Sequence, residues 1–174
     1  MSMEYKTLYD GTKIPALGLG TWQIGGRNVP DYSKDSENIT AMKNALELGY
    51  TLIDTAEMYG AGHTEELIAT AIEGYNRDKL FIVSKVMPEH LSYEGVIKAA
   101  EGSLRRLKTD YLDLYLIHFP NNGLPNDIRG FTPYKPHARA GPLRRRSRRY
   151  PRPHKALPRA HCRHCHSAGL FVAV

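Results

Sequence analysis

The nine residues Leu52-Ile53-Asp54-Thr55-Ala56-Glu57-Met58-Tyr59-Gly60 decide the fold. An apolar run ends abruptly in the carboxylate of Asp54, and a tyrosine beside a glycine follows five residues later. The run is typical of a buried strand, which places Asp54 at its carboxyl end and Tyr59 in the loop that follows. In parallel α/β folds, chemistry is usually placed at that end of the strands.

Two later apolar runs end in the same way. Residues 80–84 lead into Lys85, and residues 112–117 lead into His118. Because the carboxyl ends of parallel strands lie at one edge of a sheet, an Asp, a Tyr, a Lys and a His could converge on one pocket.

Helical spacing fills the gaps between these strands. Apolar residues that recur every three or four positions predict three helices, which start at Asp35 or Ser36, at Thr64 and after Ser92. Asp, Ser and Thr favour the N-cap position. We interpret Gly60-Ala61-Gly62 as a flexible link before the second helix. The third helix is expected to use one apolar face, made of Val96, Ile97, Ala100, Leu104 and Leu107.

The N-terminal part adds a hairpin and one more strand. Asp10-Gly11 lies between two short extended runs and predicts a β-hairpin, which could cover the bottom of a barrel. Residues 16–22 predict a first buried strand. Its Gly18 and Gly20 would let another group approach the backbone closely.

These elements alternate strand and helix three times and end on a fourth strand. The order predicts the α/β class, with a parallel sheet and right-handed crossovers. Four such strands suit either half of a closed barrel or a small open sheet. A complete eight-fold barrel typically needs about 250 residues, whereas this chain has 174.

The chain divides sharply in charge. Residues 131–174 hold eleven of the 24 Lys and Arg residues and no Asp or Glu, which leaves 13 basic and 18 acidic residues before them. Six prolines and no sustained apolar periodicity in that segment predict disorder. We therefore expect a half barrel in residues 1–122 and an irregular or disordered basic tail in residues 123–174. Only residues 170–174 of the tail resemble a strand.

The sequence also bears on compartment and metal. We expect no signal peptide at the N-terminus, and no run approaches the ~18 apolar residues of a membrane span. The first 130 residues contain no cysteine, which fits a reducing compartment. We expect a cytoplasmic protein without a membrane partner. Cys162 and Cys165 form one C-x-x-C pair, which is half a zinc site, so no metal is expected.

The four residue types at the strand ends suit delivery of a proton to an oxygen. A phenol is a weak acid with a reference pKa of ~10, and an ammonium beside it stabilises the phenolate. Lys85 could serve Tyr59 in this way, with Asp54 holding the lysine in a salt bridge. His118 could hydrogen-bond the phenol or a substrate oxygen. Reduction of a carbonyl needs such a proton, while the hydride must come from a cofactor.

Four motifs carry a resemblance to a known family. They occur in order within residues 5–120, about two-thirds of the chain, and are Lys13–Trp22, Ile53–Gly60, Val83–Val86 and Leu104–His118. With these motifs the chain resembles the N-terminal half of an aldo-keto reductase.

The resemblance implies a fold of the (β/α)8 TIM-barrel type, of which only the first four strands are present. It implies an oxidoreductase that reduces aldehydes or ketones to alcohols by hydride transfer from NADPH. By this match Tyr59 is the general acid, Lys85 and Asp54 tune it, and His118 orients a small-molecule carbonyl substrate. The positions that correspond to cofactor binding are Gly20, Thr21, Trp22 and Asp54.

The resemblance ends after about Asn122. The family's four further strand–helix units, which complete the cofactor site, are not recognisable, so the chain looks truncated or frame-shifted and we expect weak or no activity. The alternative is a non-catalytic α/β fragment whose basic tail binds nucleic acid or acidic surfaces, although we favour an accidental charge run over nucleic-acid binding. A regulatory subunit is disfavoured because all four catalytic positions are filled. The carbonyl substrate, the choice of NADPH over NADH and the oligomeric state do not follow from these residues.

Overall fold

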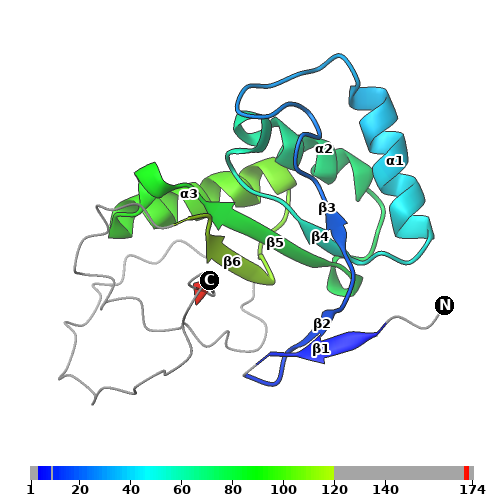
Figure 1. Cartoon of the computed structure of the whole chain (residues 1–174), viewed down its shortest axis with the longest axis horizontal. Helices are drawn as coiled ribbons and strands as arrows, with labels where there is room; N and C mark the ends of the chain where they lie inside the picture. The colour runs from blue at the N-terminus through cyan, green and yellow to red at the C-terminus, as the bar shows by residue number, and fades with distance from the viewer. Residues whose placement is uncertain (1–3, 9, 120–170, 173–174) are drawn as a thin grey trace.

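The computed structural model of the chain describes residues 4–8, 10–119 and 171–172 (Figure 1). The strands in this part of the chain are β1 (Tyr5–Thr7), β2 (Lys13–Pro15), β3 (Leu19–Gly20), β4 (Leu52–Asp54), β5 (Phe81–Val86), β6 (Leu114–Ile117) and β7 (Phe171–Val172). The α-helices are α1 (Asp35–Glu47), α2 (His63–Ala71) and α3 (Tyr93–Leu107). Short 3₁₀ turns lie at Tyr59–Gly62, Arg77–Lys79 and Pro88–His90.

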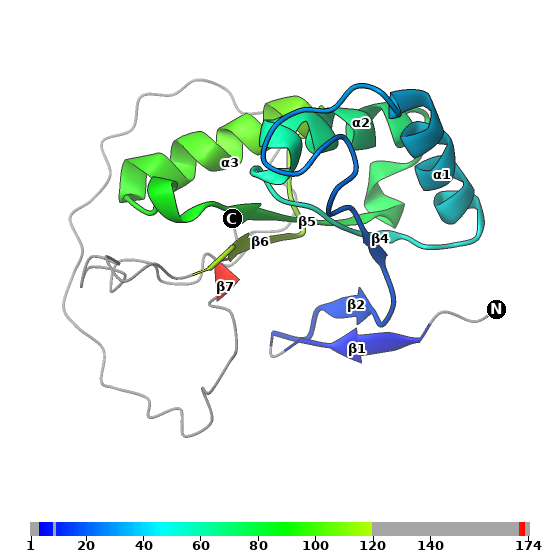
Figure 2. The same ribbon diagram turned by 45° about the horizontal axis from the view of Figure 1, so that its top comes forward.

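The main sheet has the strand order β3-β4-β5-β6-β7. Neighbours from β3 to β6 pair in parallel, and α1, α2 and α3 are the three connections between them. Figure 2 shows the three helices in one layer over one face of the sheet. The predicted α/β class and parallel order are therefore confirmed, and the arrangement is that of the first four units of a (β/α)8 barrel.

The predicted hairpin is also confirmed. β1 pairs antiparallel with β2, with Tyr5 opposite Pro15 and Thr7 opposite Lys13. Figures 1 and 2 place it at the end of the sheet where β3 begins. The hairpin therefore lies at the end of the sheet opposite to the strand ends that carry the predicted chemistry.

The core lies between the sheet and the helix layer. Side chains from alternate positions of β4, β5 and β6 meet apolar side chains of the three helices. Its largest fully buried side chains are Met42, Ile53, Ile68, Ile82, Val86, Leu107 and Tyr115. Burying an aliphatic side chain of this size contributes about 1.5–3 kcal/mol, so this layer is the main source of stability.

The predicted first strand within residues 16–22 exists, but its predicted length and burial are wrong. Only Leu19 and Gly20 are paired as a strand, and the side chain of Leu17 is 64% exposed. Among the described strands β3 pairs with β4 alone and lies at the edge of the sheet, so its flanking residues have a described sheet neighbour on one side only.

The predicted helix starts were right to within one residue, but the predicted N-cap of α1 was wrong. The N-cap of α1 is Lys34, which makes no side-chain cap bond, and Asp35 instead directs its carboxylate to a histidine. α2 begins one residue before Thr64, whose hydroxyl donates to the Ile24 carbonyl. Ser92 caps α3 as predicted, accepting from the Gly95 N–H at 3.0 Å.

The predicted apolar face of α3 needs one change. Ile97 is 42% exposed, whereas Ala99 and Ser103 are buried. The buried stripe is therefore rotated toward small residues, which let α3 pack closely over the sheet. The predicted link at Gly60-Ala61-Gly62 is a tight turn whose residues have positive φ.

Most of the predicted tail lies outside the described residues. This applies to the arginine run, to Cys162 and Cys165, and to the proposed boundary at residue 122. Within residues 170–174, Phe171–Val172 is a strand as predicted, and it pairs antiparallel with β6. The alternative hypothesis, that a basic tail binds nucleic acid or acidic surfaces, also concerns residues outside the described ranges.

Candidate active site

Three neighbouring strands bring Asp54, Lys85 and His118 to one face of the sheet. Asp54 is the last residue of β4, Lys85 the fifth of β5, and His118 follows β6. Side chains alternate between the two faces of a strand, and the residues just before these three, Ile53, Ser84 and Ile117, point toward the helices. The three polar side chains therefore project from the face that carries no helix among the described residues.

The register of the sheet staggers these positions regularly. Asp54 pairs with Val83, two residues before Lys85, and Lys85 pairs with Leu116, two residues before His118. Each strand thus carries its polar residue two positions further along than its neighbour. Strands that tilt in a barrel need such a stagger, and it keeps groups from successive strands within reach of one another.

The Lys85 ammonium is the centre of the cluster. Its Nζ lies 2.8 Å from Asp54 Oδ1, 2.8 Å from the Thr55 carbonyl oxygen and 3.4 Å from the Tyr59 hydroxyl. The lysine side chain is only 13% exposed, while that of Asp54 is 41% exposed. The cation is thus largely enclosed, and the Asp54 carboxylate is its most exposed partner.

Tyr59 is held by an unusual turn. Residues 60–62 all have positive φ, at 56°, 52° and 96°, and the middle one is the non-glycine Ala61. Because left-handed backbone is costly for a residue with a Cβ, the surrounding structure must impose this conformation. The Gly60 N–H donates to the Arg27 carbonyl at 2.6 Å, which ties the turn to the loop that precedes α1.

Aromatic rings flank the Tyr59 phenol. Trp22 meets it edge-on at a centroid distance of 4.8 Å, and the His118 ring lies at 5.4 Å. All four predicted catalytic residues are thus neighbours in space, although they come from positions up to 64 apart in sequence.

His118 is poised as a neutral hydrogen-bonding group. Burial lowers the pKa of His118 below its usual value of 6.5, the Lys85 cation lowers it further, and Asp54 opposes both effects only in part. Its Nδ1 is buried and has no hydrogen-bond partner among the described residues. A buried nitrogen without a partner is costly, so it is a candidate to receive or donate a bond to a ligand.

The predicted cofactor positions differ in what they offer. An added Cβ on Gly20 would meet no atom within 4 Å, so its backbone faces open space, whereas one on Gly18 would lie 2.0 Å from the Leu52 side chain. Trp22 is 46% exposed beside Tyr59. Thr21 is fully buried, and its hydroxyl donates to the Asp54 carbonyl at 2.9 Å, so it fixes the backbone of Asp54 rather than facing a ligand.

Two groups beside the site were not predicted. The Thr55 carbonyl accepts from Lys85, and no sequence signal reveals this because every residue carries a carbonyl. Glu57 lies between Asp54 and Tyr59 in sequence; it is buried, and its carboxylate accepts from the Met87 N–H at 2.7 Å. A charged residue inside a run of small and apolar residues was a signal that could have found it.

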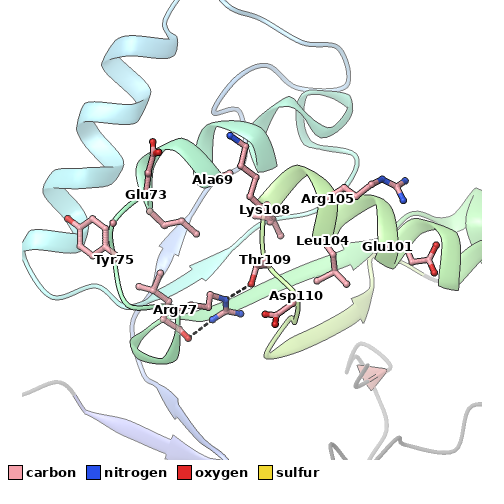
Figure 3. Close-up of a pocket in the computed structure, with 14 residues that line it drawn as sticks. Ala69, Glu73, Tyr75, Arg77, Glu101, Leu104, Arg105, Lys108, Thr109 and Asp110 are labelled. Atoms are coloured by element: carbon pink, nitrogen blue, oxygen red, sulfur yellow. Dashed lines mark hydrogen bonds between the residues drawn. The ribbon is translucent and has the colours of Figure 1, made fainter. Parts of the chain in front are cut away.

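A pocket of about 890 Å³ opens elsewhere, where α2 and α3 end (Figure 3). It contains none of the four residues above. Arg77 lies in it, but its guanidinium already donates to Thr109 Oγ1, the Leu80 carbonyl and Asp113 Oδ2. The Arg77 guanidinium is therefore engaged by the protein itself rather than free in the pocket.

Within residues 4–8, 10–119 and 171–172, no three His, Cys, Asp or Glu side chains gather as a metal site requires. None of the helices described in the same ranges has the length and apolar character needed to cross a membrane.

Comparison with known proteins identifies similar sequences. The model of the Aldo/keto reductase family matches residues 16–163. Methylglyoxal reductase YeaE of Escherichia coli is 48% identical over 106 residues, which cover 61% of this chain and 36% of that protein.

Solved structures give the same result. The thermostable aldo-keto reductase Tm1743, crystallised with the inhibitor epalrestat, is 57% identical with a TM-score of 0.68 and covers 71% of this chain and 45% of that one. An aldo-keto reductase from Klebsiella pneumoniae in complex with NADPH is 39% identical with a TM-score of 0.61, covering 70% and 41%. The chain thus spans less than half the length of each of these proteins.

Proposed function

Because the chain belongs to the Aldo/keto reductase family, we propose that its site reduces small aldehydes or ketones to alcohols, with NADPH as hydride donor and Tyr59 as general acid. The substrate class includes compounds of the methylglyoxal type, after the name of the E. coli relative.

The observation that supports this most is the Lys85 ammonium between the Asp54 carboxylate and the Tyr59 hydroxyl, at 2.8 and 3.4 Å. There the cation stabilises the negative charge that develops on the phenol oxygen as its proton leaves. Asp54 and the Thr55 carbonyl hold the ammonium in that orientation.

His118 completes the arrangement. With its pKa lowered by burial and by Lys85, the imidazole is neutral near pH 7 and hydrogen-bonds the carbonyl oxygen, which keeps that oxygen within reach of the phenol. NADPH, when bound, supplies the hydride to the carbonyl carbon. Tyr59 gives its proton to the carbonyl oxygen, which completes the alcohol, and recovers a proton from solvent.

The described residues fit a nicotinamide ring. Gly20 offers open space at its α-carbon, Trp22 presents a half-exposed ring beside Tyr59, and Asp54 exposes its carboxylate. We propose that these three contact the ring and that Thr21 fixes their backbone. The loops that the family resemblance assigns to the cofactor phosphates come after the fourth strand–helix unit, so we propose weak turnover for the 174-residue chain.

The test combines turnover with binding. We expect slow NADPH-dependent reduction of a small aldehyde by the whole chain, reduced about 10²–10⁴-fold in Tyr59→Phe and unchanged in Tyr93→Phe, whose ring is 62% exposed on α3. Trp22 is the only tryptophan, so its fluorescence reports NADPH binding beside Tyr59. A chain that shows neither turnover nor a change in Trp22 fluorescence with NADPH would contradict the proposal, as would turnover that Tyr59→Phe leaves intact.

A further inference from the structure

Glu57 is a buried carboxylate next to the candidate site, and its side chain binds Met87 and His90 rather than one of the four site residues. Its side chain is 6% exposed. One oxygen, Oε1, accepts from the Met87 N–H at 2.7 Å and contacts His90 Nδ1 at 3.1 Å. A charge is rarely buried without a specific partner, because the desolvation is costly. The position of these partners indicates what Glu57 does.

The backbone around Glu57 continues the pairing of β4 with β5 beyond the end of β4. The Thr55 N–H donates to the Val83 carbonyl at 2.9 Å, and the Glu57 N–H donates to the Lys85 carbonyl at 3.3 Å. In a parallel ladder the next rung would join the Met87 N–H to the backbone carbonyl of residue 57. Here the Glu57 side chain accepts that N–H instead.

The use of a side-chain acceptor in place of a backbone carbonyl serves both the pairing of β5 and the turn of the main chain. The side chain keeps β5 attached for one more rung, while the main chain is released to turn at Met58, which is already helical with φ −78° and ψ −17°. Glu57 therefore holds Lys85 from both sides, through the carbonyl of Lys85 itself and the amide of Met87. Tyr59 follows two residues later.

We propose that Glu57 is a positioning residue that sets the contact between the Tyr59 hydroxyl and the Lys85 ammonium. The significance of that contact for catalysis rests on the function proposed above. The contact can be measured without turnover, through the ¹³Cζ NMR signal of Tyr59 in chain labelled at tyrosine, assigned by its loss in Tyr59→Phe. Lys85→Met gives the position of that signal when the ammonium is absent.

Two substitutions at Glu57 separate reach from charge. Glu57→Gln keeps the length and one acceptor oxygen, and we expect the Tyr59 signal to stay in place. Glu57→Asp keeps the charge but is one methylene shorter, and we expect the signal to move toward its position in Lys85→Met. Equal positions in wild type and in a Glu57→Asp chain with native circular dichroism would overturn the proposal.

A second pair of variants removes the donor instead of the acceptor. Met87 has φ −76° and ψ 156°, which proline adopts without strain. Met87→Pro deletes the N–H that donates to Glu57. Met87→Ala shortens the side chain but keeps that N–H. We expect the Tyr59 signal to move in Met87→Pro and not in Met87→Ala, and equal behaviour of the two would overturn the proposal even if Glu57→Asp does not fold.

The outcomes also separate this inference from the proposed function. A Tyr59 signal that responds to Lys85→Met but to neither Glu57→Asp nor Met87→Pro would overturn the positioning role alone. A Tyr59 signal that Lys85→Met leaves unmoved would overturn the lysine–phenol contact, and with it both proposals.

Discussion

His63 is a single imidazole held between two carboxylates. Its side chain is 7% exposed, with Nε2 2.9 Å from Asp35 Oδ1 and Nδ1 3.3 Å from Glu66 Oε2, and the Tyr32 ring lies against it. Burial disfavours the charged ring, but the hydrogen bonds and charges of Asp35 and Glu66 outweigh it and raise the pKa of His63 above 6.5. The interaction ties α1 to α2.

This geometry predicts that the contribution of His63 to the free energy of unfolding falls as pH rises. Because the folded pKa of His63 is raised, its contribution is complete below the unfolded value of about 6.5 and is lost as pH rises through the folded value. We expect the difference in unfolding free energy between wild type and His63→Gln, from urea titration, to be larger at pH ~5.5 than at pH ~8.5. His118 has a lowered pKa and acts in the opposite direction, but it is present in both chains and cancels. A difference that does not vary with pH would contradict the prediction.

At the residue scale, the sequence allowed prediction of the polar residues that directly follow the apolar runs of the strands. Asp54, Lys85 and His118 each follow an apolar run, and the pleat then fixes their common face. The pairing of His63 with Asp35 could not be predicted, because the two residues lie 28 apart and meet only when α1 packs on α2. The catalytic roles of the four site residues remain proposals.

At the scale of elements, one buried carboxylate joins two helices and a strand. Glu65 of α2 is fully buried, accepts from Ser84 of β5 at 2.6 Å and pairs with Arg106 of α3 at 2.7 Å. The Arg106 side chain is 27% exposed. Removing the arginine would leave a buried charge without its counter-ion.

We therefore predict that Arg106→Met lowers the unfolding free energy by about 3–5 kcal/mol. Adding Glu65→Gln should recover part of this loss, because the charge that lacks a partner is then gone. The matched control is Arg105→Met, on the exposed side of the same helix, with an expected change within about 0.5 kcal/mol. Urea denaturation measures all three, and equal losses at positions 105 and 106 would show that the ion pair has no special weight.

The helices and strands could be predicted from the periodicity of apolar residues, whereas the helix caps could be predicted only in part. Ser92 could be predicted as a cap because its hydroxyl meets an N–H three residues on, which is a local interaction. Asp35 has equal intrinsic preference for that role, but His63 competes for its carboxylate. Local chemistry therefore predicted where α1 starts, and a tertiary contact decided what its first acidic residue does.

At the scale of the whole molecule, stability is distributed unevenly. The core cluster contains residues of β4, β5 and β6, whereas Tyr5, Lys6 and Thr7 of the hairpin are all exposed. We predict that amide hydrogen exchange is slowest in β5, whose Ile82 and Val86 are fully buried, and fastest in β1 among the strands from β1 to β6. Exchange measured by mass spectrometry on the intact chain tests this, and equal protection of β1 and β5 would contradict it.

The parallel order of the sheet could be predicted because three strand–helix connections allow few topologies. The exposure of residues 16–18 could not, since it depends on β3 being an edge strand. The antiparallel partner that β7 provides to β6 was equally out of reach, because a terminal apolar run carries no signal for the strand it will join. The proposed division at residue 122 stays a prediction.

The alternation along β5 restricts how this protein can change in length during evolution. Inserting or deleting a single residue within Phe81–Val86 would exchange the two faces of the strand. The Lys85 ammonium would then point into the hydrophobic core, and the Ser84 hydroxyl would point away from Glu65. Changes in the connecting loops have no such effect. Length variation should therefore be tolerated between strands, while within them the parity of each position is as essential as the identity of the side chain it carries.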